Sequence, residues 1–283
     1  MRRFAGIEEK YCSYDNAEVL LQSIPYDGTS TWVKGADKGF AAFLEALENM
    51  ELYDIETDSE AYTHGVHILP DIVENETPES MFQAVYEKSR ELLASGKYLT
   101  CFGGEHSVSI GVIKAYYEKY KHLTVLQLDA HADLRDSYDG TPYNHACALH
   151  DASQNTNLIQ VGIRSADSSE MKYLNRQQCY FAEDIYGDES WMDKSIAQMT
   201  DQVYLTIDLD AFDPSIMPAT GTPEPGGLLW NTTIKYLRKV FEAKTVVGFD
   251  ITEFAPLEGQ HAPQFLVAKL YYNLLSYKFK YNG

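Results

Sequence analysis

The sequence predicts an α/β protein in which a mostly parallel sheet lies between two layers of helices. The chain has 283 residues, 45% of them hydrophobic, which is enough for a sizeable core. Short apolar runs alternate with amphipathic stretches, a pattern typical of parallel sheets covered on both faces. No internal repeat, low-complexity tract or long linker divides the sequence. We therefore expect a three-layer α/β/α sandwich in one domain, residues 1–283.

Seven apolar runs have the length and composition of buried strands. Several are almost continuously apolar, as expected of strands that helices cover on both faces. The runs span residues 17–25, 98–104, 124–130, 158–164, 179–185, 202–210 and 246–254.

Four stretches between these runs are predicted to be amphipathic helices. They span residues 35–50, 77–95, 107–120 and 231–243. Thr77 is a suitable cap for the second helix, and Ser80 follows it at the spacing at which capping residues interact.

The charge of the chain limits its partners. The formal net charge is -19, from 42 acidic and 23 basic residues. Nucleic acid is excluded as a partner, because binding phosphates needs a basic surface. An acidic surface can draw a small cationic molecule into a cleft, although the same charge can also simply keep a protein soluble.

The cysteines and the N-terminal stretch indicate the compartment. The four cysteines stand far apart and form no C-x-x-C pair. The stretch "MRRFAGIEEKYCSYDNAEV" has no continuous apolar centre of the kind that a secretory signal needs. Free thiols in a reducing compartment are then the expected state. No apolar run approaches the ~20 residues of a membrane span, so we expect a cytoplasmic protein with no membrane partner.

Polar side chains gather where the predicted strands end, which is where parallel α/β folds place their functional groups. In "DAHAD" and "DLD", potential metal ligands stand at every second position. Side chains two apart in an extended chain share a face, so each set can point one way. A histidine also follows the glycine pair of "GGEHS". The candidate metal ligands are His106, Asp129, His131, Asp133, Asp208 and Asp210.

Such a ligand set needs cations. Four carboxylates in one place would repel one another, and burying an unpaired charge is very costly. Two divalent ions would balance the four aspartates, and a mixture of carboxylate and imidazole suits manganese, with zinc, iron, cobalt or nickel also possible. Six ligands around two ions require bridging carboxylates, which would hold the ions ~3.5–4 Å apart. We therefore expect two Mn²⁺ per chain.

Four segments resemble the ureohydrolases, the arginase and agmatinase superfamily, and agmatinase most of all. They read "CFGGEHSVS", "QLDAHADLRD", "TIDLDAFDPSIMPATGTPEPGG" and "GFDITEFAP". The resemblance covers nearly the whole chain and implies a three-layer α/β/α fold with a binuclear Mn(II) site. By this resemblance, His106 and Asp133 would bind one ion, and His131 and Asp210 would bind the other. Asp129 and Asp208 would bridge both ions.

The resemblance also implies a reaction. A guanidinium carbon is a poor electrophile because resonance spreads its charge, and water is a poor nucleophile at neutral pH. Two metal ions would lower the pKa of a shared water and so supply hydroxide. The hydroxide would attack the carbon, and Asp133 would orient it and pass its proton to the departing amine. Urea and an alkylamine would be released.

Two further residues match positions of this family. Glu253, in "DITEFAP", matches the glutamate that grips the guanidinium, since a carboxylate can accept two parallel N–H bonds from that planar group. His145, twelve residues after Asp133, matches the histidine that shuttles protons, a role suited to a near-neutral pKa. Alternatively, Glu253 is an exposed residue at a strand end and His145 is a surface histidine, neither with a role in the reaction.

The loop after the metal motif bears on the substrate. "LRDSYDGTPYNHACAL" resembles the agmatinase pattern, and Asp136 and Asp139 would add negative charge at the entrance, unless they are only solvated loop residues. This favours agmatine, cleaved to putrescine and urea, with the longer aminopropylagmatine as an alternative. Guanidinobutyrate, guanidinopropionate and arginine carry a carboxylate, and Arg135 and Arg164 keep them as alternatives.

Two other classes remain as rivals. Metal-dependent deacetylases share the architecture but use a single zinc ion and lack the equivalent of His106. A non-catalytic relative would be expected to have lost metal ligands, whereas all six are present. By resemblance the chain would form a homo-oligomer, a trimer or a hexamer.

Overall fold

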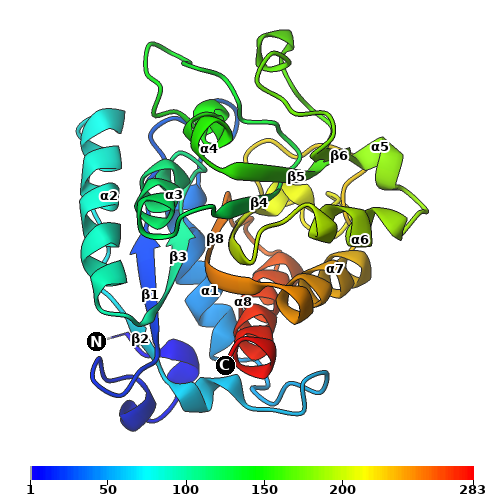
Figure 1. Ribbon diagram of the computed structural model, residues 1–283. Coiled ribbons are helices and arrows are strands. Elements are labelled where there is room, and N and C mark those ends of the chain that lie inside the picture. Colours follow the sequence, from blue (N-terminus) through cyan, green and yellow to red (C-terminus); the bar gives the residue numbers. More distant parts are fainter. Residues whose placement is uncertain (1) are drawn as a thin grey trace.

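An eight-stranded sheet forms the centre of the computed structural model, which describes residues 2–283 (Figure 1). The strand order is β2-β1-β3-β8-β7-β4-β5-β6, and all neighbouring strands are parallel. The strands are β1 (Val19–Ile24), β2 (Val66–Ile68), β3 (Tyr98–Gly103), β4 (Thr124–Leu128), β5 (Asn157–Ile163), β6 (Cys179–Phe181), β7 (Gln202–Asp208) and β8 (Thr245–Thr252). The predicted parallel sheet is confirmed.

Helices cover both faces of this sheet. Within residues 2–283 the α-helices are α1 (Gly39–Leu47), α2 (Pro78–Ala94), α3 (Val108–Lys119), α4 (His150–Asn155), α5 (Ala182–Ile185), α6 (Ser190–Ala197), α7 (Trp230–Ala243) and α8 (Ala262–Tyr281). Helices α1, α6, α7 and α8 pack into one hydrophobic cluster and α2, α3 and α4 into the other. Figure 1 shows α2 and α3 on one side of the sheet and α7 and α8 on the other. The predicted three-layer sandwich is confirmed.

The central strands are buried on both faces. Along β4, Val125 packs into one hydrophobic cluster and Leu126 into the other. Strands covered in this way need apolar side chains at odd and even positions alike, which explains their nearly continuous apolar sequence. Polar side chains inside them, such as Gln127 and Thr206, are fully buried. They need hydrogen-bond partners, because burying an unpaired polar group is costly.

Helix α2 begins with the predicted cap. The hydroxyl oxygen of Thr77 accepts a hydrogen bond from the Ser80 amide at 3.0 Å, and the Ser80 hydroxyl accepts one from the Thr77 amide at 3.1 Å. Pro78 occupies the first helical turn, where no intrahelical partner for its nitrogen is needed. The cap therefore satisfies amides that the helix itself leaves free.

The secondary structure differs from the prediction in several places, and β2, α4 and α6 were not predicted. The predicted strand 179–185 is wrong in its second half, because α5 begins at Ala182. The predicted strand 202–210 ends at Asp208, and a 3-10 helix follows at Leu209–Ala211. Helix α8 was not predicted, because many of its faces are buried and it lacks the one-sided apolar pattern of a surface helix.

The sheet order brings four polar strand ends together. Strands β3, β8, β7 and β4 are consecutive neighbours, and parallel pairing puts their carboxyl ends at one edge. Leu128 of β4 lies beside Ile207 of β7, and Asp208 lies beside Thr252 of β8. The motifs that follow these strands therefore meet. Among residues 2–283 no helix is both long and apolar enough to span a membrane.

Candidate metal centre and active site

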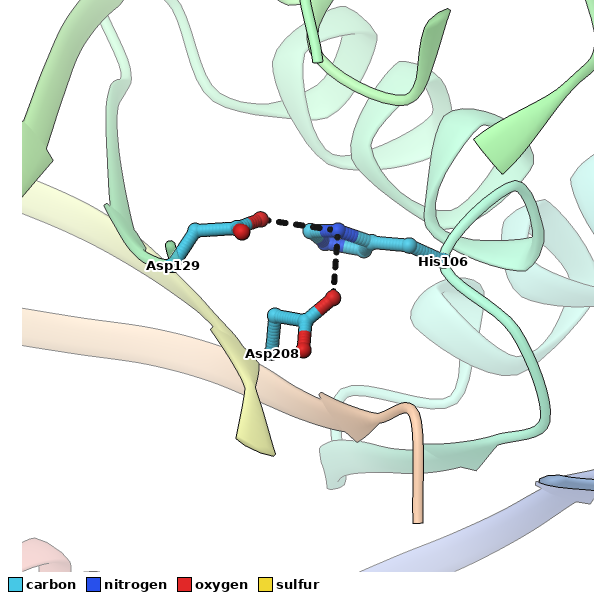
Figure 2. Close-up of side chains that lie close together, drawn as sticks. All are labelled: His106, Asp129 and Asp208. Atoms are coloured by element: carbon cyan, nitrogen blue, oxygen red, sulfur yellow. Dashed lines mark ion pairs between the residues drawn. The ribbon is translucent and has the colours of Figure 1, made fainter. Parts of the chain in front are cut away.

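His106 lies at the centre of a first group of carboxylates. Its Nδ1 atom is 3.1 Å from Asp129 Oδ2, 3.0 Å from Asp133 Oδ2 and 3.3 Å from Asp208 Oδ2. Figure 2 shows the imidazole reaching from the loop after β3 towards Asp129 and Asp208, which come from the ends of β4 and β7. All four side chains are buried.

His131 forms the second group, on the other side of Asp129. Its Nδ1 atom lies 2.9 Å from Asp210 Oδ2 and 3.7 Å from Asp129 Oδ1. The two oxygens of Asp129 thus face different histidines. The potential ligand atoms of His106, Asp129 and Asp208 lie within 4.8 Å of one another, and so do those of Asp129, His131 and Asp210.

Backbone amides at the strand ends hold two of these carboxylates in place by hydrogen bonds. Asp208 ends β7, and its carboxylate accepts a hydrogen bond from the Asp210 amide at 2.9 Å. The amide of His131 donates to Asp129 Oδ1 at 2.6 Å. Asp133 has a φ of 53° and Glu253 a φ of 63°, left-handed conformations that are strained for such residues. Strain of this kind is typical of functional sites.

Glycine is required where the chain turns towards His106. A Cβ atom added to Gly104 would lie 1.9 Å from the carbonyl oxygen of Tyr26. Only a residue without a side chain permits this approach of two backbones. The turn is therefore built into the "GGEH" sequence.

Burial and crowding raise the pKa of two of these carboxylates. Burial, together with the neighbouring Asp129 carboxylate, raises the pKa of Asp133 to about 7. Burial and the charges of Asp210 and Asp129 raise the pKa of Asp208 well above its usual range. Burial alone would lower the pKa of His106, but its hydrogen bonds to these carboxylates raise it well above normal. The cluster therefore favours added positive charge.

The donor set fits two divalent cations. Four carboxylates and two imidazoles are ligands that first-row divalent ions accept, and two such ions would balance the four negative charges. One ion could be bound by His106, Asp133 and Asp208, and the other by His131 and Asp210. Asp129 belongs to both groups. The bridging role of Asp208 stays a prediction, because Asp208 belongs to only one of the two groups.

A cavity of about 160 Å³ opens above this cluster. Four of the six candidate ligands line it, and so do Glu253 and His145. The lining comprises Thr31, His131, Asp133, Arg135, Tyr138, His145, Ala146, Asp208, Asp210, Thr222 and Glu253. His106 and Asp129 are not part of this lining. The cavity is thus a small, anionic chamber whose floor is the cluster.

Comparison with known proteins supplies the classification. Residues 17–276, nearly the whole chain, match the family model described as the arginase family. The chain belongs to the arginase family. This confirms the resemblance predicted from the four motifs and places the chain among hydrolases that act on amidino C–N bonds. A binuclear metal centre is characteristic of the family, and the two Asp/His groups are consistent with it.

Individual members of the family resemble the chain over most of its length. It is 34% identical over 280 residues to an N(1)-aminopropylagmatine ureohydrolase from Synechocystis, covering 95% of this chain and 92% of that one. It is 29% identical over 267 residues to an agmatinase from Pyrococcus horikoshii, covering 92% of each. The crystal structure of an agmatine ureohydrolase from Thermoplasma volcanium, 28% identical, superposes with a TM-score of 0.88 over 100% of this chain and 96% of that one.

Glu253 and His145 lie on the walls of the cavity of this arginase-family chain. Glu253 is buried, and its Oε1 atom accepts a hydrogen bond from the His106 amide at 2.8 Å. Burial and the nearby Glu105 carboxylate raise the pKa of Glu253 well above its usual range. Burial, together with the charges of His131 and His106, lowers the pKa of His145 to about 4. A cationic ligand would favour the charged form of Glu253.

Asp136 and Asp139 lie outside the cavity lining. Both are exposed, and the Asp136 carboxylate accepts a hydrogen bond from the Tyr173 hydroxyl at 3.1 Å and lies 3.6 Å from the Lys172 ammonium. Asp139 sits in a turn with a φ of 49°. The structure therefore does not bring these two carboxylates to the cluster, and their predicted contact with substrate stays a prediction.

The two arginines have different settings. Arg135 lines the cavity, but its guanidinium lies over the Tyr138 ring at 4.5 Å and 3.9 Å from the Asp167 carboxylate. Arg164 donates instead to backbone carbonyls, including Asp210 at 2.6 Å and Glu224 at 2.9 Å. Arg164 thus holds the loop after β7 in place.

Sequence reasoning missed a buried relay behind His106. The Thr206 hydroxyl donates to Asp250 Oδ1 at 2.7 Å, and Asp250 also accepts a hydrogen bond from the Tyr204 hydroxyl. Thr206 has one proton to give, so its oxygen accepts from His106 Nε2, which lies 3.0 Å away. This puts a proton on Nε2, while Nδ1 faces the carboxylates. The available signal was a pair of polar residues inside apolar strands.

A second missed contact holds Asp129. The Gln127 side-chain amide donates to Asp129 Oδ2 at 2.7 Å and to the His131 carbonyl at 3.2 Å. Its own oxygen accepts a hydrogen bond from the Gln160 amide at 2.7 Å, which fixes the direction of the Gln127 amide. Groups that orient ligands in this way tune metal affinity.

Proposed function

We propose that the chain hydrolyses the guanidino group of a small cationic alkylguanidine to urea and an amine. Agmatine is the first candidate substrate, with putrescine as the second product. The observation that carries the proposal is the pair of Asp/His groups, joined through Asp129, at the floor of a cavity walled by Glu253 and His145. Its negative side chains suit a guanidinium ion.

We propose two Mn²⁺ ions as the resident metal. The ligands would be His106, Asp129, His131, Asp133, Asp208 and Asp210. When bound, the ions supply Lewis acidity that makes a water nucleophilic at neutral pH. The ligand types and the family support manganese. Which first-row metal is loaded also depends on which metals are available in the cell.

The remaining steps belong to side chains of the chain itself. Glu253 would accept N–H bonds from the guanidinium, while the His106 amide holds one of its oxygens. Asp133 faces both the cluster and the cavity, so it can take the proton of the attacking water and give it to the departing amine. His145, on the cavity wall, would exchange protons with solvent from its neutral form, because its lowered pKa keeps the imidazole uncharged at neutral pH.

N(1)-aminopropylagmatine is the second candidate. The Synechocystis relative that carries this name resembles the chain more than the Pyrococcus agmatinase does. A second cavity of about 210 Å³ shares His131, Asp133, Arg135 and Ala146 with the first and adds Asp167 and Glu170. It offers room and a carboxylate for a longer polyamine tail. Substrates with a carboxylate would have to compete with Asp167 for Arg135.

A panel of guanidino compounds tests the proposal. Urea release would be measured with added Mn²⁺ for agmatine, N(1)-aminopropylagmatine, guanidinobutyrate, guanidinopropionate and arginine. We expect one of the first two to have the highest kcat/KM, and we expect Glu253→Gln to lose turnover while it keeps the metal. Urea from none of the five would overturn the proposal. Zinc-dependent deacetylation of an acetylated amine would favour the deacetylase rival instead.

We also propose a cytoplasmic homo-oligomer, a trimer or a hexamer. The support is family resemblance and the four cysteines, all of which are free and buried. Light scattering on the purified chain measures the mass directly, and a monomer at working concentration would contradict the assembly.

A further inference from the structure

Glu105, next to the metal-cluster histidine, is a buried carboxylate that the reaction does not use. Its side chain is 0% exposed. It accepts hydrogen bonds from the Ser107 amide at 2.7 Å and hydroxyl at 2.8 Å. It also accepts from the Thr29 hydroxyl at 2.8 Å and amide at 3.2 Å. Glu105 thus ties the loop after β1 to the start of α3.

The Thr29 hydroxyl makes a second contact, with the segment that carries His145. The His145 amide lies 3.0 Å from Thr29 Oγ1. An amide N–H can only donate, so the Thr29 oxygen accepts here and its single proton is free for Glu105. Both hydrogen bonds therefore have a fixed direction, and Glu105 holds the Thr29 oxygen where the His145 amide needs it.

The His145 amide has no acceptor in its own helix. It is the first amide of a 3-10 helix, His145–Cys147, and amides at a helix start lack intrahelical partners. The other side of the segment is fastened to the exit of β4. There the Arg135 amide donates to the Ala146 carbonyl at 3.1 Å, and the Leu149 amide donates to the Asp133 carbonyl at 3.0 Å. Thr29 is the contact from the opposite side.

We propose that Thr29 is a positioning residue for His145. Held by Glu105, its hydroxyl fixes the backbone of His145 and so places the imidazole on the wall of the cavity. The inference rests on the proposed function, since it assigns the placement of a proton-transfer group in that reaction. Thr29 touches none of the metal ligands in the hydrogen-bond network described above, so its effect should appear in turnover rather than in metal content.

A double-mutant cycle tests this proposal on the Mn-loaded enzyme. Thr29→Val keeps the shape of the side chain but removes the hydroxyl, and we expect kcat to fall about tenfold or more, because small misplacements of a catalytic group have effects of this order. KM and bound metal should change little. In a His145→Ala background, the same substitution should change kcat by less than about twofold, because coupled residues are non-additive.

Matched variants separate positioning from general damage. Thr29→Ser keeps the hydroxyl and should restore most of the lost turnover. Thr156→Val removes a half-buried loop hydroxyl that bonds only the Ala152 carbonyl, and it should leave kcat unchanged. Circular dichroism melting and metal analysis would accompany each variant.

Several results would overturn the inference. They are wild-type kcat in Thr29→Val, an undiminished loss in the His145→Ala background, or no recovery in Thr29→Ser. Failure of both Thr29→Val and Thr29→Ala to fold would show a role in the whole fold rather than at His145, and would also overturn it. A wild-type chain that releases no urea would count against the proposed function itself, whereas an active wild type with an additive cycle would count only against this inference.

Discussion

Asp129 is the side chain on which the two halves of the metal centre meet. Its Oδ2 atom faces His106 and its Oδ1 atom faces His131, while Gln127 holds the carboxylate from the side. One residue can serve both groups because the two oxygens of its carboxylate point in different directions. His106 is oriented in a comparable way by Thr206. Residues outside the ligand set therefore decide how well the ligands are aimed.

Thr206→Val tests the orientation of His106. Without the hydroxyl, the Nε2–H of the imidazole loses its acceptor and Asp250 loses a donor, so we expect Mn²⁺ affinity to fall about 10–100-fold, the usual effect of such outer contacts. Metal titration by calorimetry measures it. Thr206→Ser should keep most of the affinity.

Thr100→Val is the control for that experiment. Thr100 is also fully buried in the sheet, but its hydroxyl contacts Tyr271 and the Leu20 carbonyl rather than the cluster. We expect this variant to bind metal normally. Unchanged affinity in Thr206→Val would contradict the role given to Thr206.

At the scale of elements, the site depends on the order of four strands. The chain runs through β3, β4, β7 and β8, whereas the sheet places them in the order β3-β8-β7-β4. This order sets Glu253 after β8 between the His106 loop and the aspartates of β7. A different sheet order would separate the same motifs. The strand ends, not the helices, therefore carry the chemistry, as is usual for parallel sheets.

The cap of helix α2, formed by Thr77 and Ser80, contacts none of the candidate metal ligands, so it should affect stability rather than turnover. We expect Thr77→Ala to lower the free energy of unfolding by about 1 kcal/mol, because the Ser80 amide loses its acceptor. Urea denaturation measures this change, and Thr77→Ser should restore it. Urea release from the substrate should be the same in all three proteins. Equal unfolding free energies would contradict the cap's contribution.

The whole molecule carries a formal charge of -19 and buries four aspartates in one cluster. Like charges held together oppose folding, so bound cations should stabilise the chain as well as activate it. A ligand that binds only the folded state stabilises it by about 2.7 kcal/mol at one hundred times its Kd. We therefore expect metal binding and folding to be coupled.

Removal of metal tests this coupling. We expect chelation with EDTA to lower the Tm of the Mn-loaded protein by several degrees, as seen by calorimetry, and added Mn²⁺ to restore it. Asp129→Asn should bind metal weakly, lose nearly all turnover and show little response to EDTA. A conservative change at an exposed carboxylate, Asp193→Asn, should behave like wild type. Equal Tm values with and without metal would argue against a resident ion.

The sequence by itself determined the class of the molecule and the types of its ligands. The alternation of apolar runs and amphipathic stretches is a local property, and it predicted the parallel sheet between helices. The every-second-position spacing of "DAHAD" and "DLD" is also local and identified the ligand types, although β4 ends at Leu128 and β7 at Asp208, so most of these residues lie beyond the strands. Helix α8 and the end of the predicted strand 179–185 escaped this reasoning, because local periodicity is weak in helices buried on many sides and at strand ends.

Only the tertiary structure decided which distant groups meet. The sheet order, the shared position of Asp129, the relay from Thr206 to Asp250, and the contact of Thr29 with His145 all join segments far apart in the chain. The exposure of Asp136 and Asp139 was likewise decided by how their loop folds back on Tyr173. Such pairings depend on register and packing between segments, which the pattern within any one segment does not encode.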